Sequence, residues 1–376
     1  MLAEYEKGTG IVCEYNPFHK GHAYQINKVK EMGADFVVCA MSGDFTQRGE
    51  PAFQDKIIRA ENAVKNGADV VLEIPFPFCS MSAEGFAKAG VSILENCGLC
   101  TSIAFGSECA DVSKLSDIAR IIDSSFHKRV LSLQKENPNT SYAAARENLL
   151  AQMLGKQYAD IIKNPNDILG VEYIKAAKKL VPIAIKRSTP RGGFDENFAS
   201  SSYIRKNLFD RENRLSVLSK LPKEYCFDGI CDNDSMFYKH MLLFLMQSTP
   251  ECLSHIAEVP HGCEHSIIKN AFAAESHDEL CRLLASKTLT DAKIRRMLLF
   301  SLFGVTKDMI KTSPLYTEVL AASDKGRKML KRYADDRKII VASRVAEIKK
   351  SKEAKAQYDF MRKAREVLEK CRRITL

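Results

Sequence analysis

Two histidines set around one glycine, His19-Lys20-Gly21-His22, are the residues of this chain best suited to chemistry. They follow a short apolar run at residues 10–14 and open a segment with helical periodicity. The glycine lets the backbone come close to a ligand, and the start of a helix adds unpaired N–H groups and a positive dipole end. Both imidazoles can reach one polyphosphate. The pattern therefore predicts attack at the α-phosphate of ATP, with the histidines donating hydrogen bonds to the phosphates rather than acting as general bases.

The elements that must position these histidines alternate between strands and helices. Helical patterns at 20–31, 55–66 and 83–95 separate apolar, β-rich runs, which lie at 10–14, 35–41, 69–74, 102–105 and 182–186. This alternation is typical of an α/β fold with a parallel sheet, whose ligands bind beyond the carboxyl ends of the strands. We therefore expect the histidine turn and the turn Phe105-Gly106-Ser107-Glu108 to face one pocket. Residues 1–230 are predicted to form a Rossmann-like, nucleotide-binding catalytic domain.

The remainder of the chain has a different character. After about residue 231 the strand signals fade, and we expect an all-helical second domain over residues 231–376. The net charge of +9 is concentrated near its end, where cations outnumber carboxylates by 18 to 7 over residues 325–376. A basic helical stretch of this kind can follow a phosphate backbone, although a solvated helix face gives the same pattern.

Composition excludes several classes of protein. A chain of 376 residues with 45% hydrophobic and 27% charged residues is expected to be globular rather than disordered. No apolar run approaches the roughly 20 residues that span a bilayer, and residues 1–7 do not resemble a secretory signal. We therefore expect a cytoplasmic protein whose twelve cysteines are reduced thiols, many in apolar segments. Neither the pair Cys97 and Cys100 nor the Cys/His cluster at 252–265 has the spacing of a common zinc module, so no metal site is predicted.

Four longer strings carry a resemblance to a known family. They are Val12-Cys-Glu-Tyr-Asn-Pro-Phe-His-Lys-Gly-His22, Met41-Ser-Gly-Asp-Phe-Thr-Gln-Arg-Gly-Glu-Pro-Ala52, Phe105-Gly-Ser-Glu108 and Ile168-Leu-Gly-Val-Glu-Tyr173. They resemble the HIGH-type nucleotidyltransferases and, among these, the tRNA(Met) cytidine acetate ligase family. The resemblance implies an enzyme that joins acetate to AMP from ATP, with Mg²⁺, and releases pyrophosphate. It would then pass the acetyl group to N4 of the wobble cytidine of elongator tRNA(Met).

The resemblance also implies an ATP site, residue by residue. Its members are Val12, Cys13, Glu14, Tyr15, Asn16, Pro17, Phe18, His19, Lys20, Gly21, His22, Ala23, Tyr24, Gln25, Gly106, Asn166, Arg187 and Ser188. A later string, Ser200-Ser-Ser-Tyr-Ile-Arg205, resembles the second signature of the superfamily, in which hydroxyls and one cation hold the triphosphate from the opposite side. Ser200 and Ser202 would bind ATP, and Arg205 would join His19 and His22 as a catalytic group by stabilising the leaving pyrophosphate. The same serines can also cap the helix that follows them.

The second domain is expected to bind the RNA. Lys293, Arg295 and Arg296 precede an apolar run at 297–303, so one helix could bury one face and turn these cations outward. The terminal basic stretch adds three further candidates for binding tRNA, Lys349, Lys350 and Lys352. Tyr333 and Tyr358 are candidates either for stacking on anticodon bases or for the core.

The sequence leaves several interpretations open. Asp44 and Asp167 stand where the resemblance leads us to expect asparagine, so either is a tolerated exchange, or Asp44 marks a contact with Mg²⁺. Asp44, Arg48 and Glu50 form a charged loop, which is either a surface turn or part of the tRNA or acetate pocket. Two other functions share some of these features: a nucleotidyltransferase acting on a small molecule, and an RNA-binding protein without catalysis.

Overall fold

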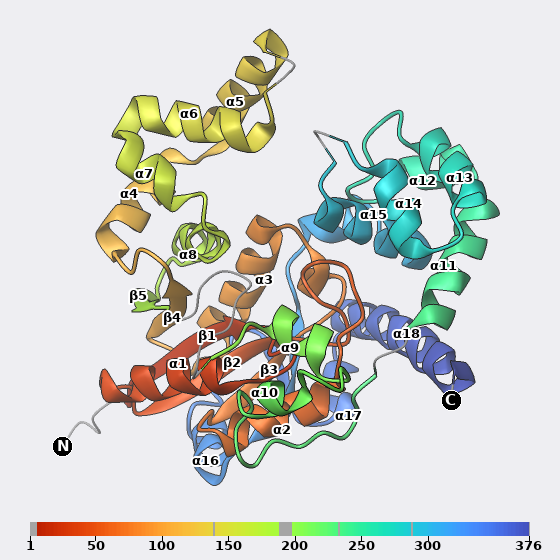
Figure 1. Ribbon diagram of the computed structural model, residues 1–376. Helices are drawn as coiled ribbons and strands as arrows, with labels where there is room; N and C mark the ends of the chain where they lie inside the picture. Colours follow the sequence, from red (N-terminus) through yellow and green to blue (C-terminus); the bar gives the residue numbers. More distant parts are fainter. Residues whose placement is uncertain (1–5, 138–139, 188–197, 232–233, 287–288, 376) are drawn as a thin grey trace.

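A mostly parallel β-sheet forms the centre of the molecule (Figure 1). The computed structural model describes residues 6–137, 140–187, 198–231, 234–286 and 289–375. Within them the sheet has seven strands in the order β5-β4-β1-β2-β3-β6-β7. The parallel strands are β1 Gly8–Cys13, β2 Phe36–Ser42, β3 Val70–Ile74, β4 Ser102–Ser107 and β5 Val181–Lys186. The predicted α/β fold is confirmed, and each of the five apolar runs forms a strand.

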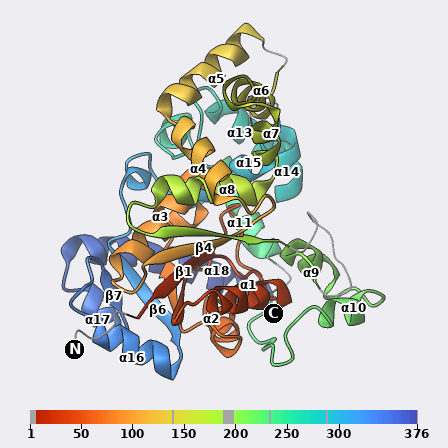
Figure 2. The same cartoon turned by 90° about the vertical axis from the view of Figure 1, so that its left-hand side faces the viewer.

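Helices cover both faces of this sheet, with α1 and α2 on one side and α3 and α8 on the other (Figure 2). Their bounds are α1 Lys20–Glu31, α2 Lys56–Lys65, α3 Ala83–Asn96 and α8 Pro165–Ala176. In β2, Val37 and Cys39 share a core with α1 and α2, whereas Val38 and Ala40 share one with α3. Because both faces are covered, the strands are continuously apolar rather than alternating, which is why the sequence identified them.

Four of the five helices between β4 and β5 form an insertion arm that rises from the sheet (Figure 1). They are α4 Val112–Ile121, α5 Ser124–Glu136, α6 Tyr142–Leu154 and α7 Lys156–Ile161. A helical body rises on the same side of the sheet, and it consists of α11 Ser235–Met246, α12 Pro250–Ser254, α13 Glu264–Ala273, α14 His277–Leu284 and α15 Asp291–Phe303. Two short helices, α9 Ser201–Asn207 and α10 Arg214–Leu218, connect the sheet to this body.

The chain after residue 231 is mainly helical, but the expectation that it contains only helices is wrong. Two strands, β6 Tyr316–Ala322 and β7 Ile340–Ala342, extend the sheet, β6 pairing antiparallel with β3. Three helices accompany them, namely α16 Asp324–Arg332, α17 Val345–Ile348 and α18 Lys352–Thr375. The sequence of β6 contains Glu318 and two alanines and is only partly buried beyond Thr317, so its strand signal is weak. Pairing with β3, including a hydrogen bond from Thr317 Oγ1 to the Glu73 carbonyl (2.7 Å), makes it a strand.

None of the helices in the described part of the chain is long and apolar enough to cross a membrane.

Candidate active site

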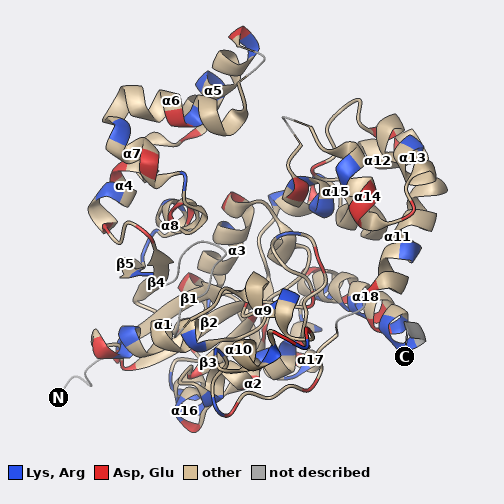
Figure 3. Ribbon diagram, viewed as in Figure 1, with Lys and Arg blue, Asp and Glu red and all other residues tan. Residues whose placement is uncertain are grey.

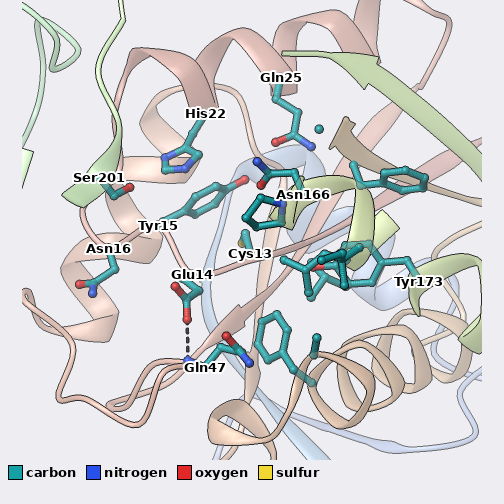
Figure 4. A pocket seen from close by; sticks show the side chains of 18 of the residues that line it. Cys13, Glu14, Tyr15, Asn16, His22, Gln25, Gln47, Asn166, Tyr173 and Ser201 are labelled. Carbon is teal, nitrogen blue, oxygen red and sulfur yellow. Dashed lines mark hydrogen bonds between the residues drawn. The ribbon is translucent and has the colours of Figure 1, made fainter. Parts of the chain in front are cut away.

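A cavity of about 440 Å³ opens where β1 and β4 end (Figure 4). A smaller cavity adjoins it and shares His22, Gln25, Gly106 and Arg187 with it. The turn after β1 and the end of β4 therefore face one pocket, as the sequence predicts, because parallel strands bring their carboxyl ends to one edge. The combined space has the size of a small-molecule site.

Most residues that the resemblance assigned to ATP line these cavities. The larger cavity is lined by Val12, Cys13, Glu14, Tyr15, Asn16, His22, Gln25, Gly106, Asn166 and Arg187, and the smaller adds His19, Gly21 and Tyr24. Pro17, Phe18, Lys20 and Ala23 are not among the lining residues; Phe18 is fully buried beneath the turn, and Lys20 is exposed. Ser188 lies outside the described residues.

The turn between β1 and α1 is held by its own side chains. Tyr15 takes a left-handed conformation (φ +48°), uncommon for a residue with a side chain, and its ring packs against both Phe18 and His22. Asn16 Oδ1 accepts a hydrogen bond from the Phe53 N–H at 2.7 Å, which ties the turn to the loop after β2. The turn is therefore fixed before any ligand arrives.

The two histidines stack on each other at the start of α1. Their ring centroids lie 3.6 Å apart with an interplanar angle of 20°. His19 caps the helix, because its Nδ1 accepts from the Gly21 N–H (3.1 Å), and His22 Nδ1 accepts from the His19 N–H (3.3 Å). His19 is thus a helix cap and also part of the cavity wall.

These contacts determine the proton positions on both rings. A nitrogen that accepts a hydrogen bond carries no proton, so the neutral ring holds its proton on Nε2. Burial lowers the pKa of His19 to about 3, with the positive charge of Arg187 acting in the same direction. Burial, His19 and Arg187 also lower the pKa of His22 well below its usual value. Both imidazoles are therefore neutral near pH 7 and can donate from Nε2.

Polar side chains from three elements meet at another part of the cavity wall. Asn166, near the start of α8, donates to Glu108 Oε1 at 2.6 Å, and Arg187, directly after β5, reaches Asn166 Oδ1 at 3.5 Å. A Cβ at Gly106 would meet only the flexible side chain of Arg187, at 3.3 Å, so the glycine leaves open space beside the cavity. The arrangement adds a guanidinium and an amide to the cavity wall that His22 also lines.

Asp167 is a structural residue. It is fully buried and accepts hydrogen bonds from Ser107 Oγ (2.5 Å), from the Glu108 and Cys109 N–H groups and from Asn164 Nδ2. A carboxylate suits this place because it only accepts hydrogen bonds, whereas an asparagine would present an NH₂ group to one of these donors. Asp167 thereby fixes the turn that follows β4.

Asp44 does not face the cavity, and the interpretation of it as a Mg²⁺ contact is wrong. Its carboxylate is paired with Lys56 Nζ at 3.1 Å, and Lys56 is paired with Glu73 at 2.7 Å. Lys56 and Glu73 are both buried, and Arg365 Nε lies 3.9 Å from Asp44 Oδ1, so two cations offset the two carboxylates.

The second signature lies against the first, but its serines divide their roles. Ser200 caps α9 by accepting from the Tyr203 N–H (3.2 Å), Ser202 is exposed, and Ser201 is the serine that lines the cavity. Arg205 donates to the carbonyl of Asn16 and does not line either cavity. Three serines in a row do not indicate which one faces a ligand.

Several lining residues were not assigned from the sequence. They are Gln47, Arg48, Ala83, Phe86, Phe105, Pro165, Ile168, Leu169, Tyr173 and Ser201. The strings at 41–52 and 168–173 contained some of them, and those strings were a usable signal. Phe86 and Ala83 on α3 gave no such signal. An apolar residue of a helix that covers the sheet has the same sequence pattern whether it packs in the core or lines a cavity.

The residues expected to bind RNA are dispersed. Arg296 is buried and held by two Nε contacts and one Nη2 contact to Glu258, whereas Arg295 is paired with Glu50, Asp278 and Asp291. The expectation that α15 turns these two arginines outward is therefore wrong, because carboxylates neutralise them inside the helical body. Tyr333 is also buried, against Phe36, and belongs to the core.

The three terminal lysines are exposed but lie far from the cavity. Lys349 and Lys350 lie in the turn directly after α17, and Lys352 begins α18, beyond β7 at the far edge of the sheet. Four strand spacings of about 4.8 Å separate β7 from β1, so this edge is roughly 20 Å from the histidines. Along α18, Lys and Arg alternate with Asp and Glu and many are paired with them (Figure 3).

A Rossmann-like sheet with stacked histidines at the mouth of its first strand defines a nucleotidyltransferase class of site. A family model described as HIGH Nucleotidyl Transferase matches residues 6–373, and the chain belongs to this family.

Relatives within this class are more specific. The chain is 35% identical over 353 residues to a tRNA(Met) cytidine acetate ligase of Acetivibrio thermocellus, covering 86% of this chain and 85% of the relative. It is 34% identical over 371 residues to the protein of that name from Caldanaerobacter subterraneus, covering 91% and 90%. Among solved structures, Thermotoga maritima TmcAL bound with alpha-thio ATP aligns with a TM-score of 0.88 at 28% identity, covering 97% of this chain and 95% of that chain.

Proposed function

We propose that this chain is an ATP-dependent ligase that acetylates N4 of the wobble cytidine of elongator tRNA(Met). The observation that most supports this is the stacked pair of neutral imidazoles in the cavity wall, with Nδ1 of each ring occupied and Nε2 carrying the proton. The relatives named as tRNA(Met) cytidine acetate ligases match about nine-tenths of the chain.

The reaction has two steps. An acetate oxygen attacks the α-phosphorus of ATP, the bond from that phosphorus to the bridging oxygen breaks, and pyrophosphate leaves. The cytidine N4 amine then attacks the acetyl carbon, AMP leaves, and the amine loses a proton. Adenylation is needed because acetate itself is a poor acyl donor.

The residues in the cavity wall suit the first step. Negative charge grows on the α-phosphate and on the departing pyrophosphate, and preorganised donors stabilise such charge without having to reorganise. His19 and His22 donate from Nε2, and Arg187 supplies a guanidinium beside them. Because the rings are neutral and their Nδ1 atoms already accept hydrogen bonds, they stabilise charge through the Nε2–H groups and do not transfer protons during the reaction.

Magnesium would enter with the nucleotide. Glu14 is the carboxylate of the larger cavity wall, and its Oε1 already accepts from the Gln47 N–H at 2.6 Å (Figure 4). Among the described residues no group of three or more His, Cys, Asp and Glu side chains is arranged to hold a metal ion. We therefore propose that ATP brings Mg²⁺ on its own phosphate oxygens.

The RNA would approach from the surface that carries the exposed lysines. Lys349, Lys350 and Lys352, together with the partly exposed Lys293, are the remaining candidates from the sequence for phosphate contacts. Their separation from the histidines means that RNA binding and adenylation use different residues. The wobble cytidine has to leave its stack to reach the cavity, as in other enzymes that modify a base.

The test is to incubate the purified protein with ATP, labelled acetate and total tRNA, and to analyse the nucleosides. The proposal predicts label in N4-acetylcytidine from tRNA(Met) and equal amounts of AMP and pyrophosphate. Adenylation of another small molecule with no label in tRNA would instead support a small-molecule nucleotidyltransferase. Binding of tRNA without release of AMP would support a non-catalytic RNA-binding protein.

A further inference from the structure

The loop after β2 carries three charged side chains, Asp44, Arg48 and Glu50, and each has a different environment. Asp44 is neutralised by Lys56, and Glu50 faces the helical body, where its Oε1 lies 3.3 Å from Arg295 Nη1. Arg48 is exposed, lines the larger cavity, and has no carboxylate within 4 Å among the described residues. Of the three, only Arg48 offers its charge to a ligand.

The backbone around Arg48 is fixed from several sides. A tight turn joins Thr46 to Glu50, with hydrogen bonds from the Thr46 N–H to the Glu50 carbonyl (2.8 Å) and from the Gly49 N–H to the Thr46 carbonyl (3.0 Å). The N–H of Gln47 donates to Glu14 Oε1, and Gln47 Nε2 donates to the Met81 carbonyl at 2.9 Å. The residue before Arg48 is thereby anchored to both β1 and the start of α3.

The helical body holds the other side of the same turn. Gly49 has φ +82°, and a Cβ there would lie 2.5 Å from the backbone nitrogen of Arg296, so α15 presses directly on the turn. The Arg295 side chain is 16% exposed and is fixed by Asp278 and Asp291, each at 2.9 Å, while it contacts Glu50. Arg48 is therefore held on a rigid turn, and its long side chain has no carboxylate partner among the described residues. This geometry suits a ligand-binding group better than a solvated surface arginine.

The surroundings of Arg48 point to an anion as its ligand. Burial lowers the pKa of Arg205, Glu14 and Glu50 raise it, and the positive charge of Arg48 lowers it, so Arg48 and both carboxylates lie near this second guanidinium. Ser201 lines the same cavity as Arg48 and can add a hydroxyl donor. Arg187 lines this cavity as well, and two guanidinium groups on one cavity are stabilised when an oxyanion binds between them, since a planar guanidinium fits phosphate oxygens.

We propose that Arg48 is a further substrate-binding residue of this site, which takes a phosphate oxyanion, and that the ion pair between Glu50 and Arg295 is the contact that positions it. This inference rests on the proposed function. The phosphate belongs either to ATP, as part of the leaving pyrophosphate, or to the RNA chain next to the modified base.

Arg48→Gln tests the binding role, with Arg129→Gln as a matched control. Arg129 is an exposed arginine on α5 that does not line either cavity. Acetate-dependent exchange of labelled pyrophosphate into ATP, without tRNA, is measured first, and transfer of acetyl to tRNA at saturating ATP is measured second. Wild-type protein without any exchange would overturn the proposed function itself, and this inference with it.

Each source of phosphate gives a distinct result. If the phosphate is that of ATP, Arg48→Gln lowers kcat/KM for ATP in the exchange reaction about 10- to 100-fold. If it is that of RNA, exchange stays at the wild-type rate, KM for tRNA rises by a similar factor, and the salt dependence of binding falls by about one phosphate contact. Both reactions remaining within about 2-fold of wild type and of Arg129→Gln would overturn the binding role.

The positioning role is tested by coupling. Glu50→Gln weakens the contact with Arg295 but keeps Arg48, and it is expected to lower the affected kcat/KM about 3- to 10-fold. In the double variant with Arg48→Gln, the Glu50 substitution is expected to have no further effect, because the group that it positions is gone. Losses that multiply in the double variant would show that Glu50 acts independently of Arg48 and would overturn this part.

Discussion

Acid pH should unfold this protein partly through its buried histidine cap. The folded-state pKa of His19 is lowered to about 3 by burial, whereas an unfolded histidine has a pKa near 6.5. Between these values the unfolded chain binds a proton that the folded chain rejects. Keeping His19 neutral therefore lowers the free energy of unfolding very little well above pH 6.5, and that free energy falls as the pH drops from about 6.5 towards 3.

The size of this effect follows from the two pKa values. At pH 7.5 both states are neutral and the contribution is close to zero. At pH 5.5 the unfolded histidine is about nine-tenths protonated while the folded one is not, and the loss is about 1.4 kcal/mol. Any folded-state pKa below about 4.5 gives nearly the same figure at that pH, so the prediction does not depend on its exact value.

The assay compares wild type with His19→Asn by urea unfolding at pH 7.5 and 5.5, without nucleotide. Asparagine keeps a side-chain acceptor for the Gly21 N–H at the helix cap but does not titrate. The difference in unfolding free energy between the two proteins should shift by about 1.4 kcal/mol in favour of the variant at the lower pH. A difference that is the same at both pH values would refute the claim that His19 is held neutral by burial.

Three further variants test other parts of the structure. Gly106→Ala should keep the unfolding free energy within about 1 kcal/mol of wild type, because only the Arg187 side chain must move. The same variant should raise KM for ATP at least about 10-fold. An unchanged KM would show that ATP does not approach this strand end. Arg59 is fully buried and donates hydrogen bonds to the carbonyls of Glu14, Ser42, Gly43 and Gln54. Arg59→Met should therefore lower the free energy of unfolding in urea by roughly 3–5 kcal/mol. A loss below about 1 kcal/mol would contradict its role in tying the strand ends together. Replacing the terminal lysines at 349, 350 and 352 by glutamine should raise KM for tRNA and flatten its salt dependence without changing pyrophosphate exchange; a loss of exchange instead would place these lysines in the catalytic step.

Local patterns predicted the part of the fold that holds the nucleotide. The five parallel strands are short, apolar and separated by helical periods, so periodicity alone identified each of them. The histidine turn was recognisable because its glycine and two imidazoles stand within the longer string at residues 12–22, which is specific where the turn alone is not. What made it a site, the stacking of His19 on His22 and the engaged Nδ1 atoms, depends on side-chain geometry that spacing does not determine.

Long-range pairing explains what the sequence did not reveal. Strand β6 is a strand because β3 offers it an edge, not because its own residues demand it. Arg295 and Arg296 look like surface cations in a helix, but their carboxylate partners, Glu50 and Glu258, lie far away in the chain. The role of Asp44 stayed open in the sequence for the same reason, since its partner Lys56 follows an intervening loop and is buried. A charge can be found from the sequence, whereas its neutralisation can be seen only in the fold.

The most direct test of this account is pyrophosphate exchange by His22→Ala. We predict that the wild-type protein exchanges pyrophosphate into ATP only when acetate is present, and that the variant is about 100- to 1,000-fold slower because one preorganised donor to the developing charge is lost. The affinity of the variant for tRNA should stay within about 2-fold of wild type, since the exposed lysines lie roughly 20 Å away. A variant that exchanges at the wild-type rate, or that loses exchange and tRNA binding equally, would contradict the assignment of adenylation to the paired imidazoles.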